Sequence, residues 1–159
     1  MVDNNNDEKK KKLLISNAQK IKKIEVGNFY LIHDGSLNGH PGLIIWKNDT
    51  HNLYLAIKFG SSLSKDNTKF AYSLSKDVSN SYYYKRLFLG KRKNFGSVIL
   101  EKFNIKEKDK MNLLEKLDLS NPKYSPDIRR KDKRFYKWAI KNPLYQGQLS
   151  CPKGTSWHK

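Results

Sequence analysis

Aromatic and basic side chains follow one another closely in one stretch of the chain, and this combination suits an unpaired nucleic acid. Tyr82-Tyr83-Tyr84 is followed at once by Lys85 and Arg86, and Lys91-Arg92-Lys93 comes soon after with no acidic residue between. Aromatic rings stack on unpaired bases while cations hold phosphates. We therefore expect Tyr83, Lys85, Arg86 and the block Lys91, Arg92 and Lys93 to contact single-stranded RNA. The alternative is that the tyrosines pack inside the protein as ordinary strand residues.

A second basic run lies near the carboxyl end of the chain. Arg129-Arg130-Lys131 is followed by Lys133-Arg134, with one acidic residue between them. In a helix these side chains would line the polar face and could hold phosphates, so Arg129, Arg130, Lys133 and Arg134 are further candidate RNA contacts. A solvated charged surface without a partner is the alternative.

The net charge of the chain is unevenly distributed. The 159 residues include 32 Lys and Arg against 15 Asp and Glu, a formal charge of +17. Residues 85–110 hold nine basic and three acidic residues, residues 129–159 hold nine and one, and residues 27–84 hold five and four. A bias of genome composition would spread the charge more evenly. The blocks therefore favour a polyanionic partner, nucleic acid ahead of an acidic protein or membrane.

Several classes of protein are disfavoured by the sequence. A single cysteine, Cys151, allows no internal disulfide and agrees with a reducing compartment. Cys151 and His158 are too few for a zinc site, and no phosphate-binding loop, dinucleotide motif or pair of catalytic carboxylates is present. We therefore expect no metal and no cofactor. No apolar run is long enough to cross a membrane and the first residues lack the apolar centre of a secretion signal, so we expect a cytoplasmic protein without a membrane partner.

The hydrophobic pattern predicts a mixed α+β protein. Short apolar or alternating runs separated by turn residues predict strands at 29–32, 43–46, 53–57, 70–74, 82–89 and 97–100. Helical spacing predicts helices at 8–24 and 110–117, the latter ended by Asn121-Pro122, and another after the start signal Ser125-Pro126-Asp127. The last helix should bury Ile128, Phe135, Trp138 and Ala139.

The order of these motifs resembles the MazF/PemK-type toxins. Gly27–Ile32 is similar to the family's opening strand, and Gly39-His40-Pro41-Gly42-Leu43-Ile44-Ile45 is similar to its strand that begins with Arg-Pro. Leu55–Ser62 resembles the strand that ends in Ile-Thr-Ser, and the stretch from Ser97 to Lys110 resembles a late strand and the start of a helix. The resemblance covers roughly residues 26–118.

This resemblance implies a fold, an activity and partners. The fold would be a small SH3-like β-barrel with flanking helices, to which this chain adds an N-terminal helical arm and a basic C-terminal helix. The activity would be metal-independent cleavage of single-stranded RNA, in which the 2′-OH attacks the adjacent phosphate and leaves a 2′,3′-cyclic phosphate and a 5′-OH end. An antitoxin, either an acidic protein or an RNA, and a homodimer would be the expected partners.

The resemblance also selects candidate catalytic residues. His40 stands where the family has Arg before Pro, and it could act as a general acid or base while another cation holds the phosphate. Ser61 and Ser62 match the Thr-Ser pair that binds the phosphate or assists catalysis, with Arg86 as a fourth catalytic candidate and Lys58 as an RNA contact. A turn histidine, a polar loop after a strand, or a barrel that has lost its catalytic site are the alternatives.

The sequence thus predicts three segments and three ranked functions. Residues 1–25 would form a basic, partly disordered arm, residues 26–119 the barrel, and residues 120–159 a basic helix and tail. The leading hypothesis is the endoribonuclease of a toxin–antitoxin pair. The second is a non-catalytic RNA- or DNA-binding accessory protein on the same barrel, and the third is a module whose basic face binds an acidic protein.

Overall fold

The structure is a computed structural model that describes residues 24–61, 67–69 and 81–142. The predicted helix at 8–24 lies, but for its last residue, outside the described residues. The predicted strand at 70–74, Ser62 and the tail from Gln146 lie wholly outside them. In the part of the chain that is described, no helix is both long enough and apolar enough to span a membrane.

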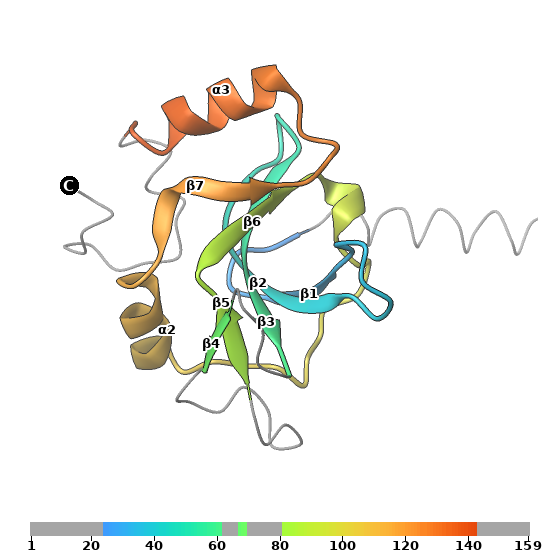
Figure 1. Cartoon of the computed structure of the whole chain (residues 1–159), viewed down its shortest axis with the longest axis vertical. Helices are drawn as coiled ribbons and strands as arrows, with labels where there is room; N and C mark the ends of the chain where they lie inside the picture. Colours follow the sequence, from blue (N-terminus) through green and yellow to red (C-terminus); the bar gives the residue numbers. More distant parts are fainter. Residues whose placement is uncertain (1–23, 62–66, 70–80, 143–159) are drawn as a thin grey trace, which may run out of the picture.

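Seven strands, two α-helices and one short 3₁₀ helix make up the described part of the chain, arranged as Figure 1 shows. The strands are β1 (Phe29–Ile32), β2 (His40–Asn48), β3 (Leu53–Gly60), β4 (Asn67–Lys69), β5 (Tyr82–Tyr84), β6 (Arg86–Gly90) and β7 (Asp118–Tyr124). The helices are η1 (Arg92–Asn94), α2 (Glu107–Leu114) and α3 (Arg130–Ala139). Neighbouring strands follow the order β1-β2-β3-β5-β4, and β6 pairs with both β3 and β7. The predicted α+β class is therefore confirmed.

The hairpin of β2 and β3 is the centre of the sheet. Residues 43–46 and 53–59 are apolar apart from Lys58, and all of them are buried, which is typical of strands that are covered on both faces. The turn between the strands contains Asn52 at a positive φ of 53°, a backbone conformation that Asn tolerates better than most residues. The pairing register shifts between Ile44 and Trp46, and this bulge adds twist to the hairpin.

The two faces of this hairpin pack into two hydrophobic clusters. The larger cluster contains Leu43, Trp46 and the buried side of α3, where the rings of Trp46 and Tyr136 meet edge to face at 5.6 Å. The smaller cluster contains Ile44 and Tyr54 with other apolar residues from β1, β6 and Phe95. The site described below lies at the open end of the hairpin, opposite its turn.

The predicted barrel is not closed. The outer edge of β1 meets residues 94–100 through one isolated bridge, Ile32 to Phe95, and through single backbone hydrogen bonds such as that from Gly96 N to Leu31 O. No described strand pairs with this edge of β1 as a ladder, so the sheet stays open. The predicted strand at 97–100 is also wrong, because that segment is irregular and leaves Val98 exposed to solvent.

Strand β7 was not predicted from the sequence. Asn121-Pro122 was expected only to end a helix, but both residues lie in β7, which pairs in parallel with β6. Arg86 pairs with Asp118 and Phe88 pairs with Lys123, so the pairing register shifts between them. Pro122 lies in this interruption, where its lack of a backbone N–H costs no hydrogen bond of the ladder. β7 spans the predicted boundary between residues 119 and 120, so the sheet includes residues from both sides of it.

Helix α3 begins and ends close to the predicted positions and turns most of the predicted face inward. Ile128 and Ala139 are buried and Phe135 packs against the larger cluster, as predicted, whereas Trp138 is 52% exposed and its predicted burial is wrong. Asp132 and Tyr136 of α3 are buried as well. The expected helix at 110–117 is α2, shifted about one turn toward the amino end.

Candidate active site

The site is built from the loop between β1 and β2 together with the adjoining ends of β2 and β3. The register of the first hairpin pairs Ile32 with His40, so the intervening loop returns close to its starting point. Gly35 and Gly39 both have positive φ angles, 91° and 66°, which lets the loop turn within a few residues. As a result Asp34, at the start of the loop, lies beside His40, at its end.

Asp34 is the acceptor on which the polar contacts of the site converge. Its Oδ2 is 2.7 Å from Nδ1 of His40 and 2.8 Å from Nζ of Lys58, a residue of β3. Its Oδ1 accepts hydrogen bonds from the backbone N–H and the hydroxyl of Ser36, at 3.2 and 2.6 Å. The carboxylate is only 5% exposed, so these donors replace the water that it would otherwise bind.

The ionised carboxylate of Asp34 sets which ring nitrogen of His40 carries a hydrogen. Burial alone would raise the pKa of Asp34, but the hydrogen bonds from Lys58 and Ser36 and the charge of Lys58 hold that pKa well below its usual value. An ionised carboxylate can only accept, so Nδ1 of His40 donates to it. The ring nitrogen Nε2 is then the one that can exchange a proton, and no described residue occupies it with a hydrogen bond.

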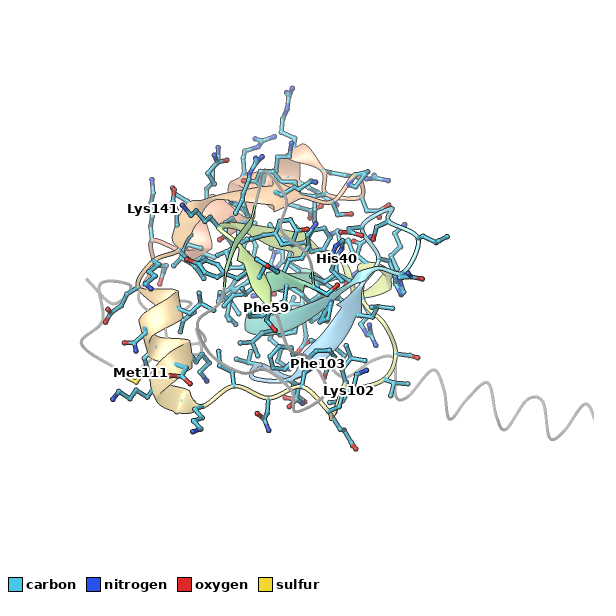
Figure 2. The ribbon with its side chains drawn as sticks, turned by 60° about the horizontal axis from the view of Figure 1, so that its bottom comes forward. His40, Phe59, Lys102, Phe103, Met111 and Lys141 are labelled. Carbon is cyan, nitrogen blue, oxygen red and sulfur yellow. The ribbon has the colours of Figure 1, made fainter. Side chains whose placement is uncertain are left out.

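His40 lies on the wall of a pocket of about 400 Å³. Rings and hydroxyls line this pocket, among them Phe59, Ser61, Ser81, Tyr84 and Phe103. Figure 2 shows His40, Phe59 and Phe103 on the same side of the molecule. The rings of Tyr84 and His40 meet edge to face, with their centroids 5.6 Å apart. Nζ of Lys58 lies 4.2 Å from the centroid of the Tyr84 ring. Lys58 is not among the residues that line the pocket. Its ammonium contacts Asp34 and the ring of Tyr84 instead.

Ser36 does not form a nucleophilic relay with His40 and Asp34. Its hydroxyl donates to Asp34 and lies 3.4 Å from Nδ1 of His40, the same nitrogen that faces the carboxylate. A relay of the serine hydrolase type needs the hydroxyl on one ring nitrogen and the acid on the other. The arrangement instead holds the imidazole of His40 in one orientation at the wall of the pocket.

The structure brings together two of the four predicted catalytic residues. His40 and Ser61 line the same pocket, and Ser62 lies outside the described residues. Arg86 is not among the lining residues. Its guanidinium donates to the backbone oxygens of Asn121 and Pro122 at 3.2 and 3.3 Å. The structure therefore assigns Arg86 to the pairing of β6 with β7 rather than to the site.

Two predicted RNA contacts near the pocket need correction. Tyr83 is buried in the larger core cluster, so its ring is not available to stack on a base, and the tyrosine at the pocket is Tyr84. Lys58 is buried and bonded to Asp34. Asp34 is a residue of the site that the sequence analysis did not select, because Asp followed by Gly is typical of a turn. The spacing of Asp34 and Ser36 before His40 was the available signal.

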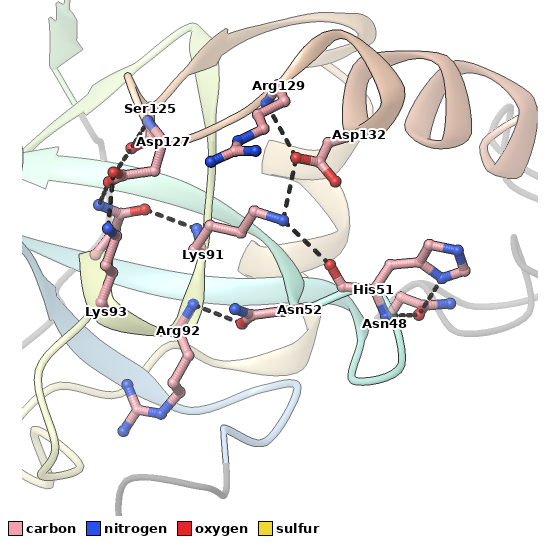
Figure 3. Close-up of polar contacts among 11 residues, drawn as sticks. Asn48, His51, Asn52, Lys91, Arg92, Lys93, Ser125, Asp127, Arg129 and Asp132 are labelled. Carbon is pink, nitrogen blue, oxygen red and sulfur yellow. Dashed lines mark hydrogen bonds and ion pairs between the residues drawn. The ribbon is translucent and has the colours of Figure 1, made fainter.

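The block Lys91, Arg92 and Lys93 is part of a structural network, drawn in Figure 3. Nζ of Lys91 lies 3.1 Å from Asp132 of α3, and Nζ of Lys93 lies 2.9 Å from Asp127. One guanidinium nitrogen of Arg92 donates to the backbone oxygens of Phe95 and Gly96. Lys91 and Arg92 thus hold η1 and the start of α3 in place, and only Lys93 is largely exposed. Binding of RNA by Lys91 and Arg92 is therefore not favoured.

The basic residues of α3 do face solvent. Arg129, Arg130, Lys133 and Arg134 are exposed, as is Lys85, the residue between β5 and β6. Lys133 has its ammonium 4.8 Å from the ring centroid of Tyr124. These residues remain candidates for contact with a polyanion.

The described residues contain no group of three His, Cys, Asp or Glu side chains that could hold a metal ion. No family model, curated protein or solved structure matches the chain at a significant level. The resemblance to MazF/PemK-type toxins therefore rests on the sequence motifs alone and stays a prediction.

Proposed function

We propose that the chain is an endoribonuclease that cleaves single-stranded RNA without a metal ion, with His40 as its proton-transfer group. The observation that carries this proposal is the 2.7 Å contact between Asp34 and His40 at the wall of a pocket lined by rings and hydroxyls. A base held in one tautomer by a buried carboxylate is the arrangement that proton abstraction from a hydroxyl requires.

In the proposed reaction the 2′-OH of a bound nucleotide is the nucleophile. Nε2 of His40 removes its proton, the 2′ oxygen forms a bond to the adjacent phosphorus, and the bond from phosphorus to the 5′ oxygen of the next nucleotide breaks. The products are a 2′,3′-cyclic phosphate and a 5′-OH end. The imidazolium formed on His40 then balances the added negative charge of the phosphorane, and Asp34 stabilises that imidazolium.

The leaving 5′ oxygen needs a proton from a second donor. Tyr84 and Ser61 both line the pocket, and a phenol is in general a stronger acid than an aliphatic hydroxyl, so we assign this role to Tyr84. Ser61 and Ser81 also line the pocket, and their hydroxyls would donate hydrogen bonds to phosphate oxygens. The pocket thus relies on neutral donors and on the imidazolium, where the resembling family has an arginine.

The rings of the pocket favour an unpaired substrate. Tyr84 and Phe103, which are half-buried, give apolar surface that can contact a base or ribose only when the base is not paired in a duplex. The toxin–antitoxin setting, the antitoxin and the homodimer belong to the same proposal and are supported by the resemblance alone. The cytoplasmic location is supported by the sequence alone.

The direct test is incubation of purified protein with a single-stranded RNA in the presence of EDTA. We expect cleavage, with products that carry a 2′,3′-cyclic phosphate and accept a new phosphate at their 5′-OH end. RNA that stays intact both with EDTA and with added Mg²⁺ would contradict the proposal. Cleavage that requires Mg²⁺ would support a nuclease activity but contradict the metal-independent mechanism.

A non-catalytic RNA- or DNA-binding protein is the second candidate. One observation favours it: Lys58, which lies beside His40, is neutralised by Asp34, whereas α3 carries many exposed cations. Binding that weakens with salt and yields no products would select this function.

A further inference from the structure

The outer face of α3 is almost wholly cationic. From Arg129 to Lys141 the exposed side chains are Arg129, Arg130, Lys131, Lys133, Arg134, Lys137, Trp138 and Lys141. The one acidic residue of this stretch, Asp132, is buried and forms an ion pair with Lys91, the residue that precedes η1. The acid therefore neutralises a neighbouring segment rather than the face of the helix.

This distribution opposes the stability of the helix. Arg130 and Arg134, and likewise Lys133 and Lys137, are four residues apart and repel each other. Arg129, Arg130 and Lys131 also stand at the amino end of α3, where the helix dipole disfavours positive charge. A helix kept only for packing would carry acids at these positions, so the pattern points to a polyanion that binds this face.

Trp138 distinguishes the kind of polyanion. Its indole is 52% exposed, on the helix surface between Arg134 and Lys141, which lie one turn to either side. A ring flanked by cations suits a single strand, whose bases can stack on it, whereas a duplex hides the faces of its bases. The apolar face of α3 is turned into the core, so the helix cannot insert into a membrane.

We propose that α3 is a second binding surface for single-stranded RNA, separate from the pocket, on which Trp138 stacks with a base. This inference rests on RNA being the ligand of the chain, as proposed above, but not on its cleavage. The stack of His51 on Phe135, with ring centroids 3.6 Å apart, fixes α3 at the turn end of the β2–β3 hairpin. Figure 1 shows α3 at that end.

The distance between the two surfaces sets the substrate length. The pocket opens at the other end of the hairpin, where His40 begins β2 and Gly60 ends β3. β3 has eight residues, so this separation is roughly 25 Å at about 3.3 Å per residue. An RNA that occupies both surfaces must therefore be several nucleotides long, and shorter fragments should not benefit from α3.

The test compares two triple variants in a His40→Ala background, which removes the proposed cleavage from the measurement. One variant carries Arg130→Gln, Arg134→Gln and Lys137→Gln, and the control carries Lys106→Gln, Lys108→Gln and Lys116→Gln. All six positions are exposed, and each variant loses three charges. Binding of a fluorescent oligouridylate of about 20 nucleotides is followed by anisotropy as salt is varied.

We expect the α3 variant to bind more weakly and the control to bind as the parent does. The slope of log affinity against log salt should become less steep by about two units, since each phosphate contact on a single strand contributes about 0.7. Trp138→Ala should weaken binding about tenfold, and Trp138→Phe, which keeps a ring, should restore most of it.

Equal losses in both triple variants, or no loss in either, would overturn the proposal. So would a preference for duplex RNA, for vesicles of phosphatidylserine, or for polyglutamate over the oligouridylate. Failure of the parent protein to cleave RNA would instead count against the proposed function and leave this binding result unchanged.

Discussion

Oδ2 of Asp34 and Nδ1 of His40 lie 2.7 Å apart, and the same carboxylate oxygen also receives Nζ of Lys58 at 2.8 Å. The contact joins the two ends of one short loop, so its geometry depends on the turn between β1 and β2 and on the register of the first hairpin. Because an ionised carboxylate only accepts hydrogen bonds, this contact places the ring hydrogen of His40 on Nδ1 and leaves Nε2 without it.

Replacement of Asp34 by Asn should slow RNA cleavage roughly 100-fold, because the imidazole loses its fixed orientation and the stabilisation of its charged form. Single-turnover kinetics with saturating enzyme would measure the effect. Asp118→Asn is a matched control, because Oδ1 of Asp118 accepts the N–H and hydroxyl of Ser120 at 2.9 and 2.7 Å, just as Asp34 accepts those of Ser36. An equal loss of rate in both variants would show that disturbing any Asp–Ser turn of this kind slows cleavage, and that the contact of Asp34 with His40 has no special effect.

Replacement of Lys58 by Met should destabilise the fold by about 3 kcal/mol, because it leaves a buried carboxylate with one charged partner fewer. Unfolding in urea gives this free energy. The double variant Asp34→Asn with Lys58→Met should lose less than the sum of the two single changes, since each single change leaves an unpaired group. Strict additivity would mean that the two residues do not interact energetically.

Two glycines of the site loop offer a matched pair. Gly35 and Gly39 both have positive φ, but a Cβ on Gly35 would meet nothing within 4 Å, whereas one on Gly39 would lie 2.6 Å from the backbone oxygen of Ile32. Gly35→Ala should therefore cost about 1 kcal/mol, the price of the backbone conformation. Gly39→Ala should cost about 1–3 kcal/mol more and should also slow cleavage, because the displaced loop carries His40. Thermal unfolding of both variants tests this order, and equal melting temperatures would contradict it.

Lys91 and Lys93 should differ in what their loss does. Lys91 is 17% exposed and pairs with the buried Asp132, while Lys93 is 70% exposed. Lys91→Met should lower the free energy of unfolding by about 3 kcal/mol, and Lys93→Met by less than about 1 kcal/mol. Chemical denaturation measures both. A Lys91→Met variant that is as stable as the parent but binds RNA poorly would contradict this assignment and show that Lys91 contacts RNA.

The parts of the fold that follow from the sequence are those set by local pattern. The apolar runs at 43–46 and 53–57 mark the central hairpin, and the signal Ser125-Pro126 marks the approach to α3. Because β2 and β3 are antiparallel neighbours, the start of one and the end of the other meet, and this brings His40 and Ser61 to one pocket.

The features that could not be predicted from the sequence depend on contacts between residues far apart in the chain, or on which residues of an alternating strand face inward. Arg86 was misplaced because its partner strand, β7, pairs with β6 in parallel from more than 30 residues away. Tyr83 was chosen over Tyr84 because alternation along a strand does not say which residues face inward. Lys91 resembled a free cation because its partner, Asp132, is 41 positions further along the chain.

The central claim is that His40 moves the proton of the 2′-OH, and the most direct measurement is imidazole rescue of the His40→Ala variant. Under single-turnover conditions with EDTA, we expect His40→Ala to cleave single-stranded RNA roughly 10²–10⁴-fold more slowly than the parent. Added imidazole should then restore part of the rate, and it should not accelerate the parent. Cleavage by His40→Ala at the rate of the parent would contradict the claim.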